Sequence, residues 1–322
     1  MATDVVTTRG ETRGSGKYER LLERCRGMAP VPTAVAHPCD DASLGAAVEA
    51  ARAGIIAPIL VGRADRIRAV AHTAGLDVTK YEIVDAPHSH AAAARAVELV
   101  RLGRAELLMK GSLHTDELMT EVVRRETGLR TDRRVSHVFV MDVPTYHKAL
   151  LVTDAAVNIF PTLDDKRDIV QNAVDFARAL GIDRPKVAIQ SAVETVTSKI
   201  PSTIDAAALC KMADRGQIQG AVLDGPLAFD NAISAEAART KGITSEVAGD
   251  PDVIVVPDLE AGNMLAKNLT FLSRADAAGV VLGARVPIIL TSRADSQRAR
   301  IASCGVAALY AAARRRAGLI AA

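Results

Sequence analysis

The stretch Glu106-Leu-Leu-Met-Lys-Gly-Ser-Leu-His-Thr115 joins a short apolar run to a polar turn and then to a helix start. The run Glu106–Met109 has the length of a strand that is buried on both faces. Thr115 is placed to cap a helix that begins near Asp116, so we expect the unpaired N–H groups of the first helical turn to point at an anion. A strand that leads into a helix through such a turn is the repeating unit of an α/β protein.

The same unit recurs along the chain from about residue 33. Continuous apolar runs are separated by Ala-rich stretches, which predicts a mainly parallel sheet with both faces covered. Two helices have clear start and stop signals, at Asp41–Ala53 before Gly54 and at Asp164–Leu180 before Gly181. Further strands are expected at Ala57–Val61, Tyr81–Val84, His137–Met141, Lys186–Ile189, Ala221–Leu223, Val253–Val256, Val280–Leu282 and Pro287–Leu290.

Composition limits the classes of protein to which this chain can belong. Its 322 residues are 49% hydrophobic and 24% charged, which is ordinary for a compact globular protein. The 40 basic and 38 acidic residues give a net charge of +2, too balanced for a protein that coats nucleic acid or membrane. We therefore expect small-molecule partners, with no nucleic acid and no membrane.

The cysteines and the N-terminal segment indicate the cellular compartment in which this protein is found. Cys25, Cys39, Cys210 and Cys304 lie far apart and form no CxxC pair, so neither a disulfide framework nor a zinc cluster is indicated. No apolar run approaches the roughly 18 residues of a membrane span. Residues 1–17 have no hydrophobic period and are expected to form a flexible tail. A reducing cytoplasm fits these features best.

Common catalytic motifs are absent or incomplete. The glycine-rich Gly10–Lys17 has the wrong spacing for a phosphate loop, and no strand precedes it. The chain has no GxSxG or HExxH motif, so neither a hydrolase nucleophile elbow nor a catalytic metal is indicated. We expect no cofactor.

Polar clusters follow several of the expected strands, at the positions where open α/β sheets bind ligands. The segment Thr291-Ser292-Arg293-Ala-Asp295 follows an apolar run, and an arginine fork suits phosphate. Each cluster taken alone is also explained as a capped turn or a surface charge. The substrate-binding residues predicted from these clusters are Lys110, Ser112, His114, Thr115, Asn158, Thr162, Asp224, Asn263 and Thr291.

Five motifs in one order resemble the phosphate acetyltransferase and phosphate butyryltransferase family. They are Lys110-Gly-Ser112, Thr153-Asp-Ala-Ala-Val-Asn158, Asp224-Gly-Pro226, Val256-Pro-Asp-Leu-Glu-Ala-Gly-Asn263 and Leu290-Thr-Ser-Arg293. The resemblance extends from about residue 30 to the C-terminus. It implies the reaction of acyl-CoA with phosphate to give acyl phosphate and CoA, through a direct ternary complex and without a metal.

The same resemblance implies a two-domain α/β/α fold with mainly parallel sheets, related to isocitrate and isopropylmalate dehydrogenases. The active site would lie in the cleft between the domains, and the protein would usually be a homodimer or higher homo-oligomer. We expect the chain to pass from one domain to the other near residue 149 and again near residue 283. This gives a discontinuous first domain, residues 1–148 with 284–322, and a second domain, residues 149–283.

The resemblance also implies catalytic roles. The family's Ser-Arg pair falls on Ser292 and Arg293, so Arg293 would hold phosphate and Ser292 would stabilise the developing charge. The family's Asp seven residues beyond that Ser, a proposed base on the CoA thiol, is here Ala299, and Asp295 is the nearest carboxylate in sequence. The Arg that binds CoA in such enzymes falls near Met119, so the contacts to CoA stay unassigned.

Two other functions stay open at this point. One is an oxidoreductase related to β-decarboxylating dehydrogenases, although the clustered Asp residues that would bind magnesium are missing. The other is a non-catalytic CoA-binding protein, because the family's base and one of its Arg residues are not matched. The length of the acyl group is also open among acetyl, propionyl and butyryl.

Overall fold

The computed structural model describes residues 16–291 and 295–318. Within these ranges the chain alternates strands and helices in the predicted manner. The strands are β1 (Val31–Ala36), β2 (Ile56–Gly62), β3 (Glu82–Asp85), β4 (Leu107–Lys110), β5 (Ser136–Asp142), β6 (Leu150–Thr153), β7 (Lys186–Gln190), β8 (Val222–Leu227), β9 (Val253–Val255), β10 (Asp276–Leu282) and β11 (Ile288–Ile289).

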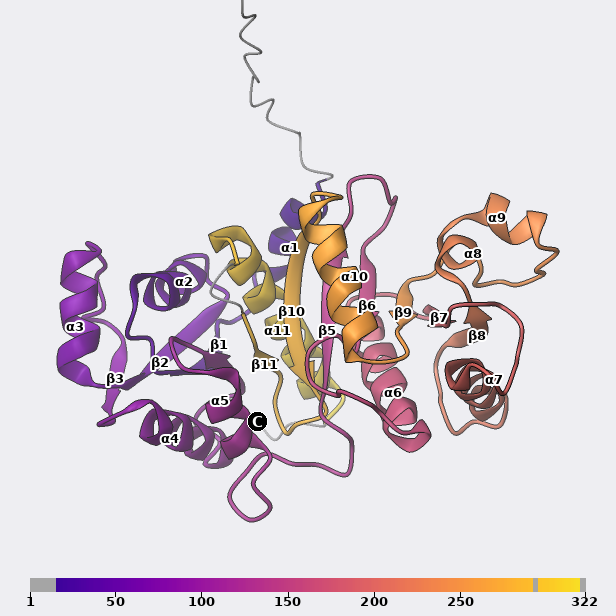
Figure 1. Cartoon of the computed structure of the whole chain (residues 1–322). Coiled ribbons are helices and arrows are strands. Elements are labelled where there is room, and N and C mark those ends of the chain that lie inside the picture. Colours follow the sequence, from indigo (N-terminus) through magenta and orange to yellow (C-terminus); the bar gives the residue numbers. More distant parts are fainter. Residues whose placement is uncertain (1–15, 292–294, 319–322) are drawn as a thin grey trace, which may run out of the picture.

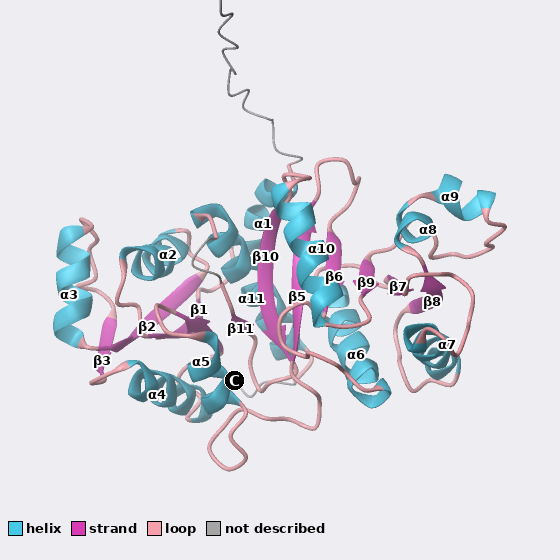
Figure 2. Ribbon diagram, viewed as in Figure 1, coloured by secondary structure: helices cyan, strands magenta, loops and turns pink. Residues whose placement is uncertain are grey.

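Helix α1 precedes the first strand, and the other helices lie between the strands or after the last of them (Figure 2). They are α1 (Lys17–Cys25), α2 (Asp41–Arg52), α3 (Ala64–Thr73), α4 (Ser89–Arg101), α5 (Thr115–Val122), α6 (Leu163–Ala179), α7 (Pro201–Asp214), α8 (Phe229–Ile233), α9 (Ala235–Thr240), α10 (Leu259–Phe271) and α11 (Gln297–Arg316). None of them, over the part of the chain that is described, has the length and hydropathy needed to cross a membrane.

The described strands form a single sheet in the order β3-β2-β1-β4-β11-β10-β5-β6-β9-β7-β8. The pairings of β10 with β11, β10 with β5 and β5 with β6 are antiparallel, and the other pairings are parallel. Figure 1 shows this sheet running across the whole molecule with helices in front of it and behind it. The prediction of an α/β fold with a large, mostly parallel sheet is confirmed. The predicted two-domain division stays a prediction. Strands β5 and β10, which belong to the two proposed domains, pair within one sheet.

One face of the sheet carries a single continuous hydrophobic core, and we call it the α11 face. Residues of α2, α3, α6, α7 and α11 join one buried cluster that reaches from β2 to β7. The largest fully buried side chain in this cluster is Phe176, which meets the Tyr310 ring edge-on with 5.5 Å between the ring centroids. Burial of this kind is the main stabilising contribution to a fold of this size.

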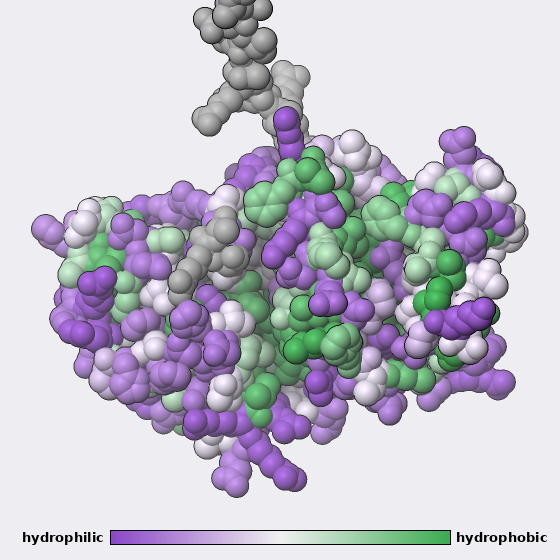
Figure 3. All heavy atoms as spheres, in the orientation of Figure 1, coloured by the Kyte–Doolittle hydropathy of each residue, from purple (hydrophilic) through white to green (hydrophobic). Residues whose placement is uncertain are grey.

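The opposite face, here called the α10 face, has a divided core. Helices α4 and α5 cover one cluster that includes Leu108 and Ile288. A second cluster, at β5, β6 and β9, packs against α10, and a third lies under α8. Figure 3 shows a hydrophobic patch in the middle of this face, beside the lower end of α10.

Local sequence signals explain the helix ends. Asp40 caps α2 by accepting a hydrogen bond from the Ser43 N–H at 2.8 Å, and Gly54 takes the positive φ that ends the helix region. The N-terminal boundary differs from the prediction, because Lys17 begins α1 rather than belonging to a tail. Lys17 is fixed there by an ion pair with Asp142 at 2.7 Å. The remainder of the predicted tail, residues 1–15, lies outside the described residues.

Candidate active site

The ends of β1, β4 and β11 meet at one place in the sheet. Their parallel pairing sets Ala36 beside Lys110 and Ile289 beside Met109, so the residues that follow these strands are neighbours. Lys110 and Thr291 are both buried there, at 6% and 4% exposure. Lys110 projects to the α10 face, because Leu108, two residues earlier, belongs to the core of that face.

The turn after β4 is held by backbone contacts. The Gly111 N–H donates to the Ala36 carbonyl at 2.8 Å, and the Ser112 N–H donates to the His37 carbonyl at 2.9 Å. A Cβ atom on Gly111 would lie 2.3 Å from the Ala36 oxygen, so only glycine allows this approach. The Ser112 hydroxyl donates to the same His37 carbonyl at 2.8 Å and accepts from the Cys39 N–H at 3.2 Å. These bonds explain Ser112 as a support of the turn, while its predicted contact with substrate stays a prediction.

Helix α5 begins immediately after this turn, one residue earlier than predicted. His114 is the N-cap, and Thr115 is the first helical residue, so the prediction of Thr115 as the cap is wrong by one position. The Glu117 carboxylate accepts a long hydrogen bond of 3.4 Å from the His114 N–H. The first-turn N–H groups of α5 still adjoin the Lys110 turn, as the sequence predicted.

The predicted Ser292 and Arg293 lie outside the described residues. The chain is described again from Asp295, followed by Ser296, which caps α11 by accepting from the Ala299 N–H at 3.1 Å. Asp295 therefore precedes the N-cap and lies outside α11. The Asp295 carbonyl accepts from Arg300 Nε at 3.2 Å. Ala299 lies in the first turn of α11.

A second polar group lies on the turn after β6. The buried Asp154 carboxylate accepts hydrogen bonds from the Ala156, Val157 and Asn158 N–H groups at 3.0–3.1 Å. Burial raises the Asp154 pKa, although these hydrogen bonds oppose the rise.

The side-chain amide of Asn158 is hydrogen-bonded through both its nitrogen and its oxygen. Its amide nitrogen donates to the Val135 carbonyl at 2.9 Å and to Asp154 at 2.5 Å, and its oxygen accepts from Arg134 Nε at 2.7 Å. This network satisfies the Asn158 amide, which accounts for its burial without a ligand. Its predicted contact with substrate is left untested.

Two further predicted residues adjoin this turn. Thr162 caps α6 and exchanges hydrogen bonds with Asp165 in a capping arrangement. Asn263, on α10, donates to the Ala155 carbonyl at 3.4 Å. The close approach of α10 depends on Gly262, where a Cβ would lie 2.9 Å from the Asp154 carbonyl oxygen. The structure thus brings Asn158, Thr162 and Asn263 to one region.

Asp224 lies apart from both groups. It is inside β8 rather than after a strand, and its carboxylate accepts from the Gly225 N–H at 2.9 Å. Strand β8 is the sheet edge, six strands from β11, a separation of about 30 Å at roughly 4.8 Å per strand. A phosphate held near Thr291 is too small to contact Asp224 in the same chain.

Comparison with known proteins identifies the family. The family model described as "Phosphate acetyl/butaryl transferase" matches residues 89–308, from α4 into α11. The chain belongs to this family. The phosphate acetyltransferase of Rhizobium meliloti is 69% identical over 306 residues, covering 95% of this chain and 96% of that protein. The phosphate butyryltransferase of Clostridium acetobutylicum is 45% identical over 294 residues, covering 91% and 98%.

A solved structure agrees with this assignment. A branched-chain phosphotransacylase from Enterococcus faecalis V583 aligns with a TM-score of 0.76 and 30% identity, covering 87% of this chain and 99% of that one. The chain is a phosphate acyltransferase, so the predicted family and reaction class are confirmed. Among the residues that the structure describes, no three His, Cys, Asp or Glu side chains are grouped to hold a metal ion.

The structure adds two histidines to this phosphate acyltransferase that the sequence did not point to. His37 follows β1 with a φ of 56° and supports the Lys110 turn through its carbonyl. His137, on β5, is 1% exposed, and its buried Nδ1 makes no hydrogen bond within the described residues. Its Nε2 lies 2.8 Å from where a Cβ of Gly279 would be, so this glycine makes room for the ring. Burial lowers the His137 pKa to about 3, which keeps the imidazole neutral.

Proposed function

We propose that this chain transfers an acetyl group reversibly between CoA and inorganic phosphate in a direct ternary complex. The 69% identity to a phosphate acetyltransferase, over nearly the whole of both chains, carries the choice of acetyl over longer groups. The buried Lys110 beside Thr291 and the start of α5 supports a phosphate site at this end of the sheet.

In the proposed reaction an oxygen of phosphate attacks the thioester carbonyl carbon. The carbon–sulfur bond breaks, and CoA leaves as a thiolate that then takes up a proton. Phosphate is already a good nucleophile as a dianion, so orientation and charge stabilisation matter more than a strong base. Lys110, Arg293 and the first N–H groups of α5 would hold the phosphate, and Ser292 would stabilise the developing charge. Asp295 is the candidate proton partner for the thiolate.

Substitution of Arg293 tests the phosphate site. We expect Arg293→Ala to lose at least about 2.7 kcal/mol of transition-state stabilisation, roughly a hundredfold in rate, because it removes one charge-stabilising donor. The measurement is CoA thiol release from acetyl-CoA with phosphate present and absent. Arg101→Ala, at an exposed helix end with no ion pair among the described residues, is the matched control. Turnover of Arg293→Ala equal to that of the control would refute the assignment.

The acyl group is tested by comparing acetyl-CoA, propionyl-CoA and butyryl-CoA at saturating phosphate. We expect the highest kcat/KM for acetyl-CoA, and a preference for butyryl-CoA would overturn that part of the proposal.

The same assay, run beside an NAD reduction assay, separates acyl transfer from the dehydrogenase alternative. Phosphate-independent CoA binding without thiol release would favour the non-catalytic alternative. Added EDTA should leave turnover unchanged, because no metal is proposed in the chemistry.

We further propose the finer features that the family resemblance implied. The active site would lie in a cleft on the α10 face, where the core is divided between the cluster of α4 and α5 and that of α10. A homodimer is supported by exposed apolar side chains at Met264, Phe271 and Leu272, on and just after α10. The unpaired state of all four cysteines supports a reducing cytoplasm. The relation of the two-domain fold to isocitrate and isopropylmalate dehydrogenases stays part of this proposal.

A further inference from the structure

A cavity of about 490 Å³ lies on the α11 face, on the side of the sheet opposite to the proposed cleft. It is bounded by α1, α11 and the end of α6, and its floor is formed by β5, β6 and β10. Floor residues Val140, Leu151 and Ala278 belong to or pack on the continuous core of that face. Leu21 and Val306 add apolar walls. A hollow of this size and character takes a small ligand with a hydrocarbon body.

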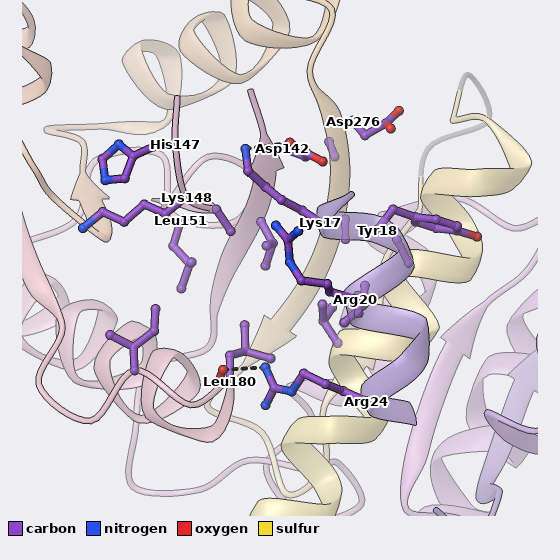
Figure 4. A pocket seen from close by; sticks show the side chains of 18 residues that line it. Lys17, Tyr18, Arg20, Arg24, Asp142, His147, Lys148, Leu151, Leu180 and Asp276 are labelled. Atoms are coloured by element: carbon purple, nitrogen blue, oxygen red, sulfur yellow. Dashed lines mark hydrogen bonds and ion pairs between the residues drawn. The ribbon is translucent and has the colours of Figure 1, made fainter. Parts of the chain in front are cut away.

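One edge of this cavity is cationic. Lys17, Arg20 and Arg24 are spaced three and four residues apart, so they share one face of α1. Figure 4 shows all three side chains extending from α1 toward the cavity. Lys17 is paired with Asp142, and Arg24 donates to the Leu180 carbonyl at 2.6 Å.

Two of these cations have no carboxylate partner. Within the part of the chain that is described, neither Arg20 nor Arg24 forms an ion pair, and the Arg20 side chain makes no hydrogen bond. Like charges four residues apart on a helix repel one another, so this arrangement destabilises α1 unless an anion lies between them. Arginine forks bind carboxylate and phosphate groups through paired N–H donors.

The other charges around the cavity are already compensated. Asp276 is bound by Arg298 at 3.0 Å, and Lys148, across the cavity from α1 in Figure 4, is held by Asp250 and Asp252. His147 also contacts Asp250, at 3.0 Å. The excess positive charge therefore lies with the two arginines of α1, at the edge of an apolar hollow.

We propose that this cavity binds an anionic amphiphile, with the carboxylate of a medium-chain fatty acid between Arg20 and Arg24 and its hydrocarbon chain against β5, β6 and α11. This site is separate from the acyl-transfer site and does not depend on it. A bound chain would contact Ala302 and Val306 of α11, the helix that begins just after the Thr291–Ser296 segment. The ligand class follows from combining two guanidinium groups that lack carboxylate partners with apolar walls.

The test is calorimetric titration of the full chain with sodium octanoate, without acyl-CoA or phosphate. Octanoate should bind at one site, whereas acetate, which lacks the hydrocarbon body, and octylammonium, which has the opposite charge, should bind at least tenfold more weakly. Equal binding of octanoate and octylammonium would overturn the proposal. Because no transferase substrate is present, this result is independent of the proposed function.

Variants locate the site. Arg20→Glu should weaken octanoate binding about tenfold or more, the loss expected for a charge-assisted hydrogen bond. Ala302→Leu should also weaken it by filling the cavity, and unchanged thermal unfolding would show that the fold is intact. Arg68→Glu, an exposed arginine of α3 with no partner among the described residues, should bind octanoate like the parent chain. Unaltered octanoate binding in both cavity variants would refute the site. The proposal would also fail if the parent chain bound no octanoate and Arg20→Glu changed the oligomeric state, because the cavity would then be the contact surface for a second copy of the chain.

Discussion

The two faces of the sheet are built differently. On the α11 face one buried cluster continues from β2 to β7, whereas on the α10 face the core is split into three. Buried polar groups accompany the split: Lys110 points to the α10 face, and Asp154 and Asn158 lie on the turn after β6. His137 lies on β5 beside Gly279, between the covered parts of that face. The α11 face thus supplies most of the apolar burial, and the α10 face accommodates polar side chains at a cost in packing.

This difference suggests a division of roles. A continuous core resists local opening, because any displacement disrupts many contacts at once. A divided core allows its parts to move relative to one another, which suits a site that admits two substrates. We therefore expect a large loss of stability where a side chain is added at a tight approach, a pH-dependent loss where a histidine is buried in its neutral form, and a small contribution from surface charges.

The largest effect is expected at the tight approach beside Lys110. Gly111→Ala should destabilise the protein by more than about 3 kcal/mol, because the new Cβ would meet the Ala36 oxygen at 2.3 Å and neither backbone can yield freely. Gly45→Ala is the matched control, since nothing lies within 4 Å of a Cβ there and the site is inside α2. That control should gain roughly 0.5–1 kcal/mol from helix propensity. Urea unfolding of both variants compares them, and equal stabilities would contradict the role given to Gly111.

A smaller, pH-dependent effect is expected from His137. Its pKa of about 3 in the folded state lies below the value of an unfolded histidine, so the unfolded chain takes up a proton first as pH falls. Stability should therefore decline from about pH 6.5 downward, by roughly 1.5 kcal/mol between pH 6.5 and 5. His137→Leu, which removes the titration and keeps an apolar contact with Phe139, should flatten this part of the curve. Parallel slopes in the two proteins, measured by urea unfolding at each pH, would exclude His137 as the cause.

Sequence reasoning located much of the fold, because continuous apolar runs are a local signal. Every predicted strand is present, but β1 and β6 were not predicted. Strand β1 contains Pro32, which weakens a strand assignment, and β6 has only the four residues Leu150–Thr153. Missing β1 also hid His37, which supports the Lys110 turn from the neighbouring strand end.

The site was predicted less completely for a physical reason. Residues that follow strands were expected to share one place, yet sheet order decides which strand ends are neighbours. Lys110 and Thr291 come together because β4 pairs with β11, whereas Asp224 is on the far edge strand. The polar Asn158 and Thr162 proved to be engaged in turn and cap hydrogen bonds, which a sequence pattern cannot distinguish from ligand contacts.

The smallest effect on stability is expected at the surface ion pairs of Asp250, which lie outside the hydrophobic cores of both faces of the sheet. Burial acts to raise the Asp250 pKa, but hydrogen bonds and charges from Lys186 and Lys148 outweigh it and lower the pKa to about 2. Because the folded-state pKa is depressed, the contribution of Asp250 is present above about pH 4 and is lost as pH falls toward 2. With the carboxylate 41% exposed, solvent screening reduces this contribution to about 1 kcal/mol.

Asp250→Asn should accordingly be less stable than the parent chain at pH 7 by about 1 kcal/mol, and the two should converge near pH 2.5. Added salt at pH 7 should narrow the difference, because exposed ion pairs are screened. Asp183→Asn, a carboxylate with no ion pair among the described residues, serves as the control and should show neither dependence. A deficit of Asp250→Asn that persists unchanged at low pH would mean that its hydrogen-bond geometry, rather than its charge, holds Lys148 and Lys186 at the ends of β6 and β7.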